Sequence, residues 1–271
     1  MRSSPPLVSC ALAIGGLDPG GGAGIAADLR AFAAAGAFGC AALAVLTVQS
    51  TAGLVSARRL SSREIDAQVR EVMKAQRVAS MKVGALGGRD NVRAVASLLA
   101  EYARVPAVVD TPMAPTRGKG RLLAARAIAA VREDLVPRAT LLTVNALEAQ
   151  ALLETPVRTA DEARAAALAL TSMGARAALV KGGHLRGADA VDVLAVGRDV
   201  IAIAAPRLAI PPTHGTGCTF ASLIAGRLAV SGASPADRGV IVRAVRWAKR
   251  VHHRALAHAA DAGRGLKVLV F

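Results

Sequence analysis

Short apolar segments alternate with longer helical segments along most of the 271-residue sequence. The apolar runs, such as residues 11–14, 40–48 and 177–181, predict buried strands, and the segments between them predict helices. Strands that alternate with helices indicate an α/β fold, with a mostly parallel sheet covered by helices on both faces. We find no linker rich in Pro, Gly or Ser and no internal repeat, so we expect one domain over residues 1–271.

Each predicted element can be given bounds. The predicted strands are residues 11–14, 40–48, 80–83, 107–110, 140–143 and 177–181, followed by a hairpin of 190–196 and 200–206. The predicted helices are residues 23–35, 61–77, 91–102, 121–133, 147–153, 161–173, 217–229 and 237–258.

The sequence is strongly basic, with a formal net charge of +15 and a pI of about 11.3. Its Lys and Arg residues are scattered, no run of five consecutive basic residues occurs, and aromatic residues make up only 2% of the chain. Nucleic-acid binding surfaces combine clustered positive charge with stacking aromatic rings, so we expect no nucleic-acid partner. A site for anionic phosphates would benefit from the same positive field.

The cysteines and one uncharged stretch bear on localisation. The three cysteines, Cys10, Cys40 and Cys218, are odd in number and form no Cys-x-x-Cys pair, which favours a reducing cytoplasm. Residues 31–57 carry no charge and are long enough to span a bilayer. Because Gly36 and Gly39 interrupt this stretch, we interpret it as a buried helix followed by a buried strand and expect no membrane partner.

Polar residues follow several of the predicted strands. Ligands of open α/β sheets bind beyond the carboxyl ends of the strands, where these residues would meet. The residues are Asp18, Gln49, Gly84, Asp110, Asn145, Lys181 and His184.

The strongest single motif is Thr213-His214-Gly215-Thr216-Gly217-Cys218, directly before a predicted helix. Glycines allow the backbone to approach a ligand closely, and the first amides of a helix form an anion hole. Cys218 falls in the first turn, where the helix dipole lowers the pKa of a thiol. A glycine-rich turn with a buried apolar cysteine explains the same pattern without a ligand.

At these residues the chain resembles the hydroxymethylpyrimidine/phosphomethylpyrimidine kinases of thiamine synthesis, within the ribokinase-like superfamily. Relatives usually carry Gly-x-Gly-Asp here, whereas the pyrimidine kinases carry Gly-Thr-Gly-Cys, as in residues 215–218. Further matches follow in the family's order from Ala11 to about Gly265. They are Asp18-Pro19, Gly21-Gly22-Ala23-Gly24, Ala27-Asp28-Leu29, Thr47-x-Gln49, Lys82-x-Gly84, Val109-Asp110-Thr111, Asn145-x-x-Glu148 and Lys181-Gly182-Gly183-His184.

The resemblance implies a three-layer ribokinase-like fold, a homodimer, and use of ATP with Mg²⁺. It implies that Gly16, Ala23 and Gln49 line the pyrimidine pocket, with Asp28 supporting the loop and Ala85 bordering the ring. Asp110, Asn145 and Glu148 are implied to hold Mg²⁺ through waters, beside the ATP phosphates. Asn145 and Glu148 also have the spacing of a helix cap.

For the phosphate end, the resemblance implies that Lys181, Thr213 and Thr216 meet ATP, while Gly215 and Gly217 neutralise the transferred group. Cys218 is then the expected general base for the acceptor hydroxyl.

Several residues depart from the family pattern. Leu17 replaces a small polar residue, Ala85 a methionine, and Thr116-Arg117 the usual Lys-Ser. These departures leave open the exact ring preference and the second phosphorylation. The leading hypothesis is a kinase of 4-amino-5-hydroxymethyl-2-methylpyrimidine and then of its monophosphate. The alternatives are a pyridoxal or pyridoxine kinase and a catalytically silent pyrimidine or nucleotide sensor.

Overall fold

In the part of the chain that the structure describes, nine strands form one continuous sheet, in the order β3-β2-β1-β4-β5-β6-β7-β8-β9. A computed structural model describes residues 8–110, 112–115, 117–118, 122–185, 188–232 and 234–271. The strands are β1 (Cys10–Leu17), β2 (Phe38–Ser50), β3 (Gly53–Arg59), β4 (Val78–Val83), β5 (Ala107–Val109), β6 (Leu141–Asn145), β7 (Ala177–Lys181), β8 (Asp189–Val196) and β9 (Asp199–Pro206). Strands β2, β1, β4, β5, β6 and β7 run parallel, while β3, β8 and β9 pair antiparallel with their neighbours.

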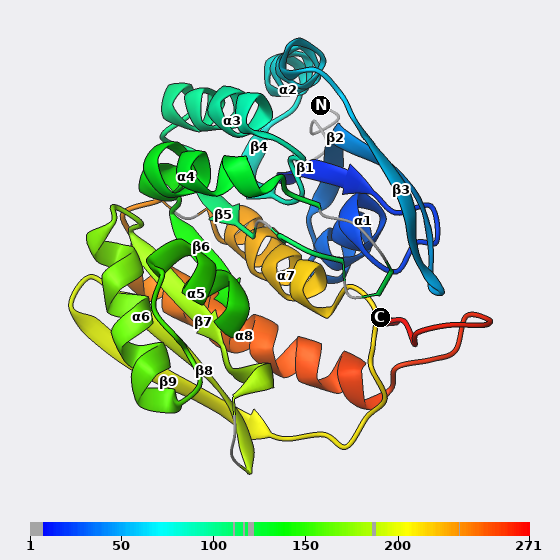
Figure 1. Cartoon of the computed structure of the whole chain (residues 1–271). Helices are drawn as coiled ribbons and strands as arrows, with labels where there is room; N and C mark the ends of the chain where they lie inside the picture. The colour runs from blue at the N-terminus through cyan, green and yellow to red at the C-terminus, as the bar shows by residue number, and fades with distance from the viewer. Residues whose placement is uncertain (1–7, 111, 116, 119–121, 186–187, 233) are drawn as a thin grey trace, which may run out of the picture.

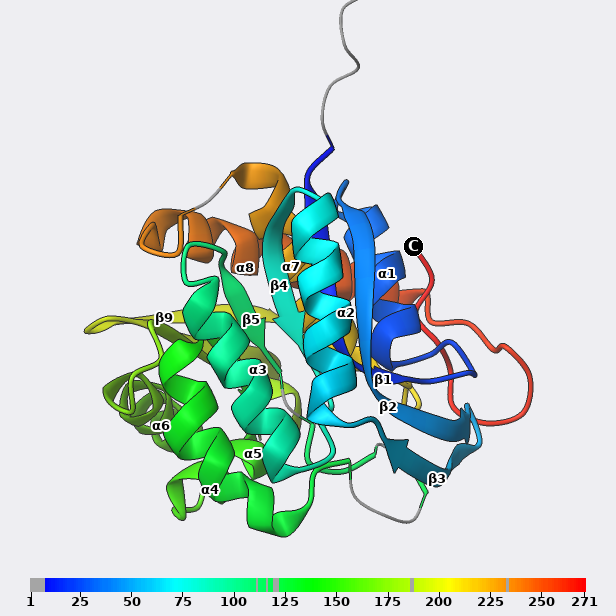
Figure 2. The same ribbon diagram turned by 90° about the horizontal axis from the view of Figure 1, so that it is seen from above.

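Helices cover both faces of this sheet, which confirms the predicted layering (Figure 1 and Figure 2). One core lies under α2 (Ser62–Ala75), α3 (Arg89–Glu101), α4 (Ile128–Ala130), α5 (Ala146–Leu153) and α6 (Ala160–Ser172). The other lies under α1 (Gly24–Ala34), α7 (Thr216–Ser231) and α8 (Arg238–Ala257). Within the described ranges, none of the helices combines the length and the apolarity needed to span a bilayer.

Local sequence signals explain several helix boundaries. Ser61 and Glu64 form the reciprocal hydrogen bonds of a capping box, so α2 begins directly after Ser61. Gly36, with a φ of 84°, follows the end of α1, and Gly232, with a φ of 63°, ends α7. Both dihedrals lie in the left-handed region that glycine tolerates, so the chain can turn away from each helix there.

The predicted helix at 121–133 is wrong in its first half. Residue 121 lies outside the described residues, and Leu122 to Ala124 are not helical. Leu123 bridges to Gly87, and the Ala124 amide donates to the Gly87 carbonyl. This pairing satisfies the backbone in place of a first helical turn. The chain then coils irregularly through η1 (Ala125–Ala127), α4, a π turn at η2 (Val131–Leu135) and η3 (Val136–Arg138).

The order of the strands places a crevice beside β1. From β1 the chain moves to β2 and β3 on one side, and then crosses to β4 on the other. Connections that leave neighbouring strands in opposite directions open a crevice at the carboxyl ends of those strands. The ends of β1 and β4 therefore mark the expected binding site.

Candidate active site

A cavity of about 740 Å³ opens at the carboxyl ends of the parallel strands. It brings together residues that lie far apart in the sequence, as expected from the strand ends. Of the predicted site residues, the cavity is lined by Gly16, Ala23, Gln49, Ala85, Asp110, Asn145, Glu148, Lys181, Thr213, Gly215, Thr216, Gly217 and Cys218. The geometry places these residues together, and their roles stay predictions.

The glycine-rich motif forms a tight entry to α7. Gly215 is the N-cap of α7 and has a φ of 67°, in the left-handed region. A side chain at Gly215 would collide with the carbonyl oxygen of Gly22, so the αL geometry and the close approach both require glycine. The first amides of α7 consequently face the cavity, where they and the helix dipole favour an anion.

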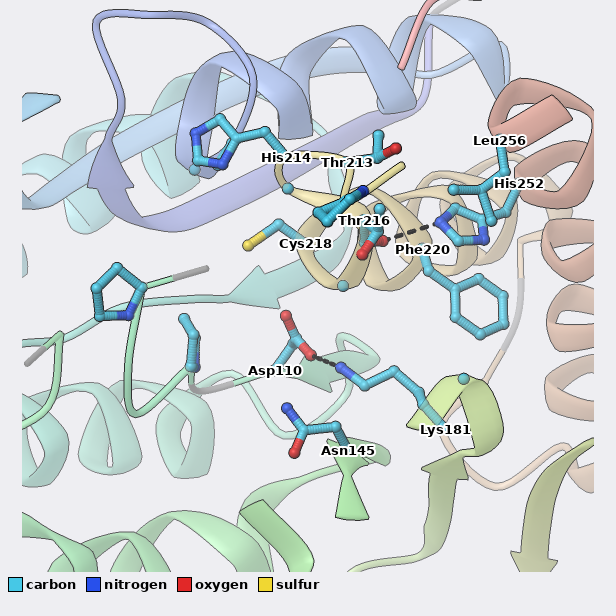
Figure 3. Close-up of a pocket in the computed structure, with 18 of the residues that line it drawn as sticks. Asp110, Asn145, Lys181, Thr213, His214, Thr216, Cys218, Phe220, His252 and Leu256 are labelled. Carbon is cyan, nitrogen blue, oxygen red and sulfur yellow. Dashed lines mark hydrogen bonds and ion pairs between the residues drawn. The ribbon is translucent and has the colours of Figure 1, made fainter. Parts of the chain in front are cut away.

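Lys181 places a positive charge in front of these amides. A β-carbon on Gly217 would lie 3.3 Å from Lys181 Nζ, so the ammonium lies close to the start of α7. Lys181 Nζ donates to Asp110 Oδ1 at 2.7 Å (Figure 3). The same nitrogen lies 4.0 Å from Glu148 Oε2. Burial alone would lower the pKa of Lys181, but the charges of Asp110 and Glu148 raise it above its usual value. The lysine is therefore a fixed cation.

Asp110 is a buried carboxylate stabilised by several neighbours. Thr143 Oγ1 donates to Asp110 Oδ1 at 2.8 Å, and Lys181 donates to the same oxygen. Burial alone would raise the pKa of Asp110, yet the charges of Lys181 and Lys82 hold it below its usual value. Asp110 is consequently ionised at neutral pH.

Asn145 and Glu148 form the capping box of α5. Asn145 Oδ1 accepts from the Glu148 amide at 2.9 Å, and Glu148 Oε2 accepts from the Asn145 amide at 2.8 Å. The capping interpretation of these two residues is confirmed. Burial raises the pKa of Glu148, which nonetheless borders the cavity beside Lys181.

The carboxylates of Asp110 and Glu148 could hold Mg²⁺ only together with other ligands. In the part of the chain that the structure describes, no three His, Cys, Asp or Glu side chains cluster closely enough to hold a metal by themselves. Asp110 and Glu148 supply two carboxylates on the same side of the cavity. Mg²⁺ commonly takes one or two carboxylates and completes its shell with water and substrate phosphates, so these residues are compatible with such a site.

Cys218 differs from the expected low-pKa thiol. Its side chain extends from the first turn of α7 into the cavity (Figure 3). Burial raises the pKa of Cys218 to about 11, with Asp110 and Asp28 adding to this shift and Lys82 and the Gly24 amide opposing it. Two carboxylates and loss of solvent therefore outweigh the helix dipole. The predicted lowering of this pKa is wrong, and the thiol is protonated at neutral pH.

Asp28 lies beneath the cavity and does not border it. Its carboxylate is completely buried and accepts hydrogen bonds from Lys82 Nζ at 3.0 Å to each oxygen. Ser222 Oγ adds a third hydrogen bond at 2.7 Å. Asp28 therefore does not contact a ligand in the cavity, whereas Lys82 borders the cavity.

Asp18, His214 and Gln49 lie close together at the other end of the cavity. Asp18 Oδ2 lies 2.8 Å from His214 Nε2 and also accepts from the Ala23 amide at 2.9 Å. Gln49 Nε2 lies 3.2 Å from the same histidine nitrogen. His214 Nδ1 is buried and has no hydrogen-bond partner among the described residues. Because His214 Nε2 donates to Asp18, it cannot also accept from the Gln49 amide, so that amide is available to a heterocycle.

Sequence reasoning missed three residues of this site. The sequence analysis assigned no role to Lys82 beyond its place in the Lys82-x-Gly84 motif. A lysine inside an otherwise apolar strand could have indicated a buried ion pair. His214 lies within the glycine-rich motif and received no role. His252, on α8, donates to the Thr216 carbonyl at 3.0 Å and stacks on Phe220, a contact that no sequence pattern indicates. Thr111 and Thr116 lie outside the described residues, as does the side chain of His184.

Comparisons with known proteins agree with this geometry. A model of the phosphomethylpyrimidine kinase family matches residues 18–269. The hydroxymethylpyrimidine/phosphomethylpyrimidine kinase of Salmonella typhimurium is 41% identical over 216 residues, which are 79% of this chain and 81% of that protein.

Two solved structures share the fold. Bacillus subtilis pyridoxal kinase, in an ADP complex, superposes with a TM-score of 0.85 at 29% identity and covers 97% of both chains. The phosphomethylpyrimidine kinase of Clostridium difficile superposes with a TM-score of 0.76 at 27% identity, over 90% of this chain and 98% of that one. With the family model matching nearly its full length, this chain belongs to the phosphomethylpyrimidine kinase family of phosphotransferases.

Proposed function

We propose that this chain transfers the γ-phosphoryl group of ATP to 4-amino-5-hydroxymethyl-2-methylpyrimidine and then to the resulting monophosphate. The observation that carries this proposal is one cavity with two chemically different ends. The start of α7 and Lys181 suit phosphate, while Gln49 and the Asp18–His214 pair suit a polar heterocycle.

At the ring end, the protein binds by hydrogen bonding and shape. The amide of Gln49 offers both a donor and an acceptor, which match the ring nitrogen and amino group of an aminopyrimidine. Gly16 and Ala85 lie next to each other in the cavity lining and carry little side-chain volume, so they leave room for a flat ring against them.

At the phosphate end, catalysis depends on positioning and charge. Phosphoryl transfer passes through a loose transition state, whose charge is spread over the equatorial oxygens. The amides of Gly217 and Cys218 and the ammonium of Lys181 are fixed in advance around that region. Mg²⁺, when bound, would neutralise phosphate charge, and Asp110 and Glu148 are the residues that would hold it through waters.

Pyridoxal phosphorylation is the second candidate function. It is favoured by the 0.85 TM-score to the Bacillus subtilis pyridoxal kinase and by Ala85, which leaves room beside the ring. The two candidates differ in the ring that must fit against Gln49 and Ala85.

One assay distinguishes the candidates. Purified protein with ATP and Mg²⁺ is offered the hydroxymethylpyrimidine, its monophosphate, or pyridoxal, and products are followed by mass spectrometry. We expect both pyrimidine products to form. Turnover of pyridoxal alone would replace the proposal by the second candidate, and turnover of none would indicate a silent binding protein.

Lys181 provides a test of the phosphate end. We expect Lys181→Met to lower turnover by ~10² or more, since it removes a preorganised charge from the transferring group. The matched control is Lys74→Met, at an exposed lysine on α2. Steady-state rates at saturating substrate are the measurement, and a rate within twofold of wild type would refute the role of Lys181.

We further propose that the enzyme acts in the cytoplasm as a homodimer. The proposal rests on the family resemblance and on the three unpaired cysteines. Light scattering at micromolar concentration gives the oligomeric state directly.

A further inference from the structure

A buried polar chain runs beneath the cavity and ends at its surface with Lys82. Ser222 on α7 donates to Asp28 on α1, and Lys82 on β4 donates to both oxygens of Asp28. The Lys82 side chain is 1% exposed and that of Asp28 is 0% exposed. Three separate elements therefore converge on one ion pair.

The ammonium of Lys82 is held in a single position. A β-carbon on Gly84 would lie 2.9 Å from Lys82 Nζ, so the Lys82-x-Gly84 spacing leaves space for the ammonium at the end of β4. A buried ion pair contributes little net stability compared with apolar packing, because both charges lose their hydration. The fold keeps a costly cation at the cavity floor, where apolar side chains would otherwise pack.

Lys82 faces the same part of the cavity as Cys218. Ser222 lies one helical turn after Cys218, so the two side chains lie on the same face of α7. Lys82 and Cys218 both line the cavity, and the charge of Lys82 acts on the thiol. Among the described residues, the hydrogen bonds of the Lys82 ammonium go to Asp28, which accepts two of them, whereas an ammonium carries three N–H donors.

The charges of Lys82 and Lys181 both act on Asp110. The carboxylate of Asp110 bonds directly to Lys181 and also interacts electrostatically with Lys82. Lys181, at the end of β7, reaches the start of α7, where the phosphates of the donor nucleotide are proposed to bind. The Lys82 side chain is 1% exposed, against 14% for Lys181, and it borders the cavity together with Cys218, Gly16 and Ala85.

We propose that Lys82 is the binding site for the anionic acceptor group, the phosphate of the pyrimidine monophosphate in the second phosphorylation. The inference rests on the proposed function and adds to it the subsite for one of its two acceptors. Asp28 and Ser222 are positioning residues that aim the ammonium.

The chemistry of the second step requires a cation and no base. An oxygen of the acceptor phosphate forms a bond to the γ-phosphorus while the bond from that phosphorus to the ADP oxygen breaks, and no proton must leave the acceptor dianion. A protonated thiol at Cys218 is compatible with this step. Lys82 offsets the repulsion between acceptor and donor phosphates with a charge-assisted hydrogen bond.

The test compares the two acceptors in variants of the ion pair. The double variant Lys82→Met/Asp28→Asn removes both charges and leaves a neutral amide whose oxygen can still accept from Ser222. We expect kcat/KM for the monophosphate to fall by about 10- to 100-fold, as for loss of a hydrogen bond between charged groups, and that for the neutral alcohol by less than about fivefold. The second variant is Lys82→Met alone. Burial raises the pKa of Asp28, so without Lys82 the Asp28 carboxyl can take up a proton and stay buried, and the variant can still fold.

The matched control is Ser80→Ala on the same strand. Ser80 is completely buried, donates to the Ala225 carbonyl at 2.6 Å and does not border the cavity. We expect it to lower the melting temperature without changing the ratio of the two activities. ADP binding, measured by calorimetry, should be retained in all variants.

The outcomes separate this inference from the proposed function. An equal loss for both acceptors, or no loss, makes Lys82 structural and overturns the inference while the kinase assignment stands. Wild-type protein that phosphorylates only the alcohol overturns it as well. Wild-type protein inactive on both pyrimidines overturns the proposed function, and the inference falls with it.

Discussion

At the scale of single residues, Cys218 lies under opposing influences. The start of α7 and the charge of Lys82 favour a thiolate, whereas burial and the nearby carboxylates of Asp110 and Asp28 oppose it. Since the pKa of the thiol is raised to about 11, only about 10⁻⁴ of it is ionised at pH 7.

This pKa can be measured by alkylation. We expect the rate of inactivation by iodoacetamide to rise about tenfold per pH unit from pH 7 to pH 10, since only the thiolate reacts. Bound substrate should slow the reaction. Cys218→Ser, which retains the buried Cys10 and Cys40, gives the background rate. A rate that levels off near pH 8 would show an ordinary or lowered pKa.

The raised pKa also changes the expected effect of removing the thiol. General-base catalysis would make Cys218→Ala lose ~10² or more in turnover. Because the thiol is protonated, we expect a loss nearer to tenfold for the alcohol and less for the monophosphate, whose phosphate needs no base. Single-turnover rates for both acceptors are the measurement. A 10³-fold loss would show that Cys218 acts as the general base after all.

Ala85 should influence ring preference. It lies at the cavity surface next to Gly16, and the family resemblance leads us to expect a methionine at this position. We expect the wild-type pocket to accept a bulkier 2-substituent, and Ala85→Met to shift selectivity toward the methyl compound by about tenfold, as for one or two buried methylenes. Competition between the 2-methyl and 2-ethyl pyrimidines measures this ratio. Equal selectivity in both proteins would mean that Leu17 fills the space.

At the scale of elements, α8 supports the start of α7 through His252. Its Nε2 donates to the carbonyl of Thr216, the first residue of α7, and its ring stacks on Phe220 with centroids 5.1 Å apart. Burial, with the charge of Lys249, lowers the pKa of His252 to about 3. The ring of His252 is therefore neutral in the folded protein at neutral pH.

This lowered pKa predicts acid sensitivity. The unfolded histidine takes up a proton near pH 6.5 and the folded one near pH 3, so its stabilising contribution is complete above pH 6.5 and is lost as the pH falls. We expect the stability advantage of wild type over His252→Phe to shrink by on the order of 2 kcal/mol between pH 7 and pH 4.5. Urea unfolding at these pH values measures it. His258→Asn, at an exposed ring, is the control, and a constant difference would contradict the prediction.

The elements differ in how far they could be predicted. The hairpin of β8 and β9 was predicted almost to its bounds, because apolar runs flank Gly197 at the turn. Strand β3 was missed: five of its seven residues are exposed, so no apolar pattern marks it, and its place comes from pairing with β2. The first half of the 121–133 helix failed for the same reason, since contact with Gly87 outweighs local helical periodicity.

At the scale of the whole molecule, topology made the site predictable. Polar residues at strand ends converge because parallel strands share one edge, and Asp110, Asn145 and Lys181 were predicted in this way. Lys82 escaped because its role depends on Asp28, 54 positions away, and on Ser222, 194 positions from Asp28, which meet only through packing. The expectation of one domain rests on the absence of a linker and stays a prediction.

The net charge of +15 should act on the whole reaction through its substrate. ATP is a polyanion, and a positive field raises its encounter rate with the cavity. Three exposed arginines of α8, Arg243, Arg246 and Arg250, lie on the helix that also lines the cavity through Lys249 and His252. Part of the positive charge is therefore carried by a helix that borders the cavity.

Salt screens such a field, since the Debye length falls from about 10 Å at 0.1 M to 3 Å at 1 M. We expect kcat/KM for ATP to fall several-fold between 0.05 M and 0.5 M potassium acetate, while kcat/KM for the neutral pyrimidine at saturating ATP changes by less than about twofold. Replacing Arg243, Arg246 and Arg250 by Gln should flatten the dependence for ATP and leave kcat unchanged. If the triple variant keeps the wild-type salt dependence, the attraction comes from Lys181 and Lys249 inside the cavity, and the surface charge has no part in capturing the nucleotide.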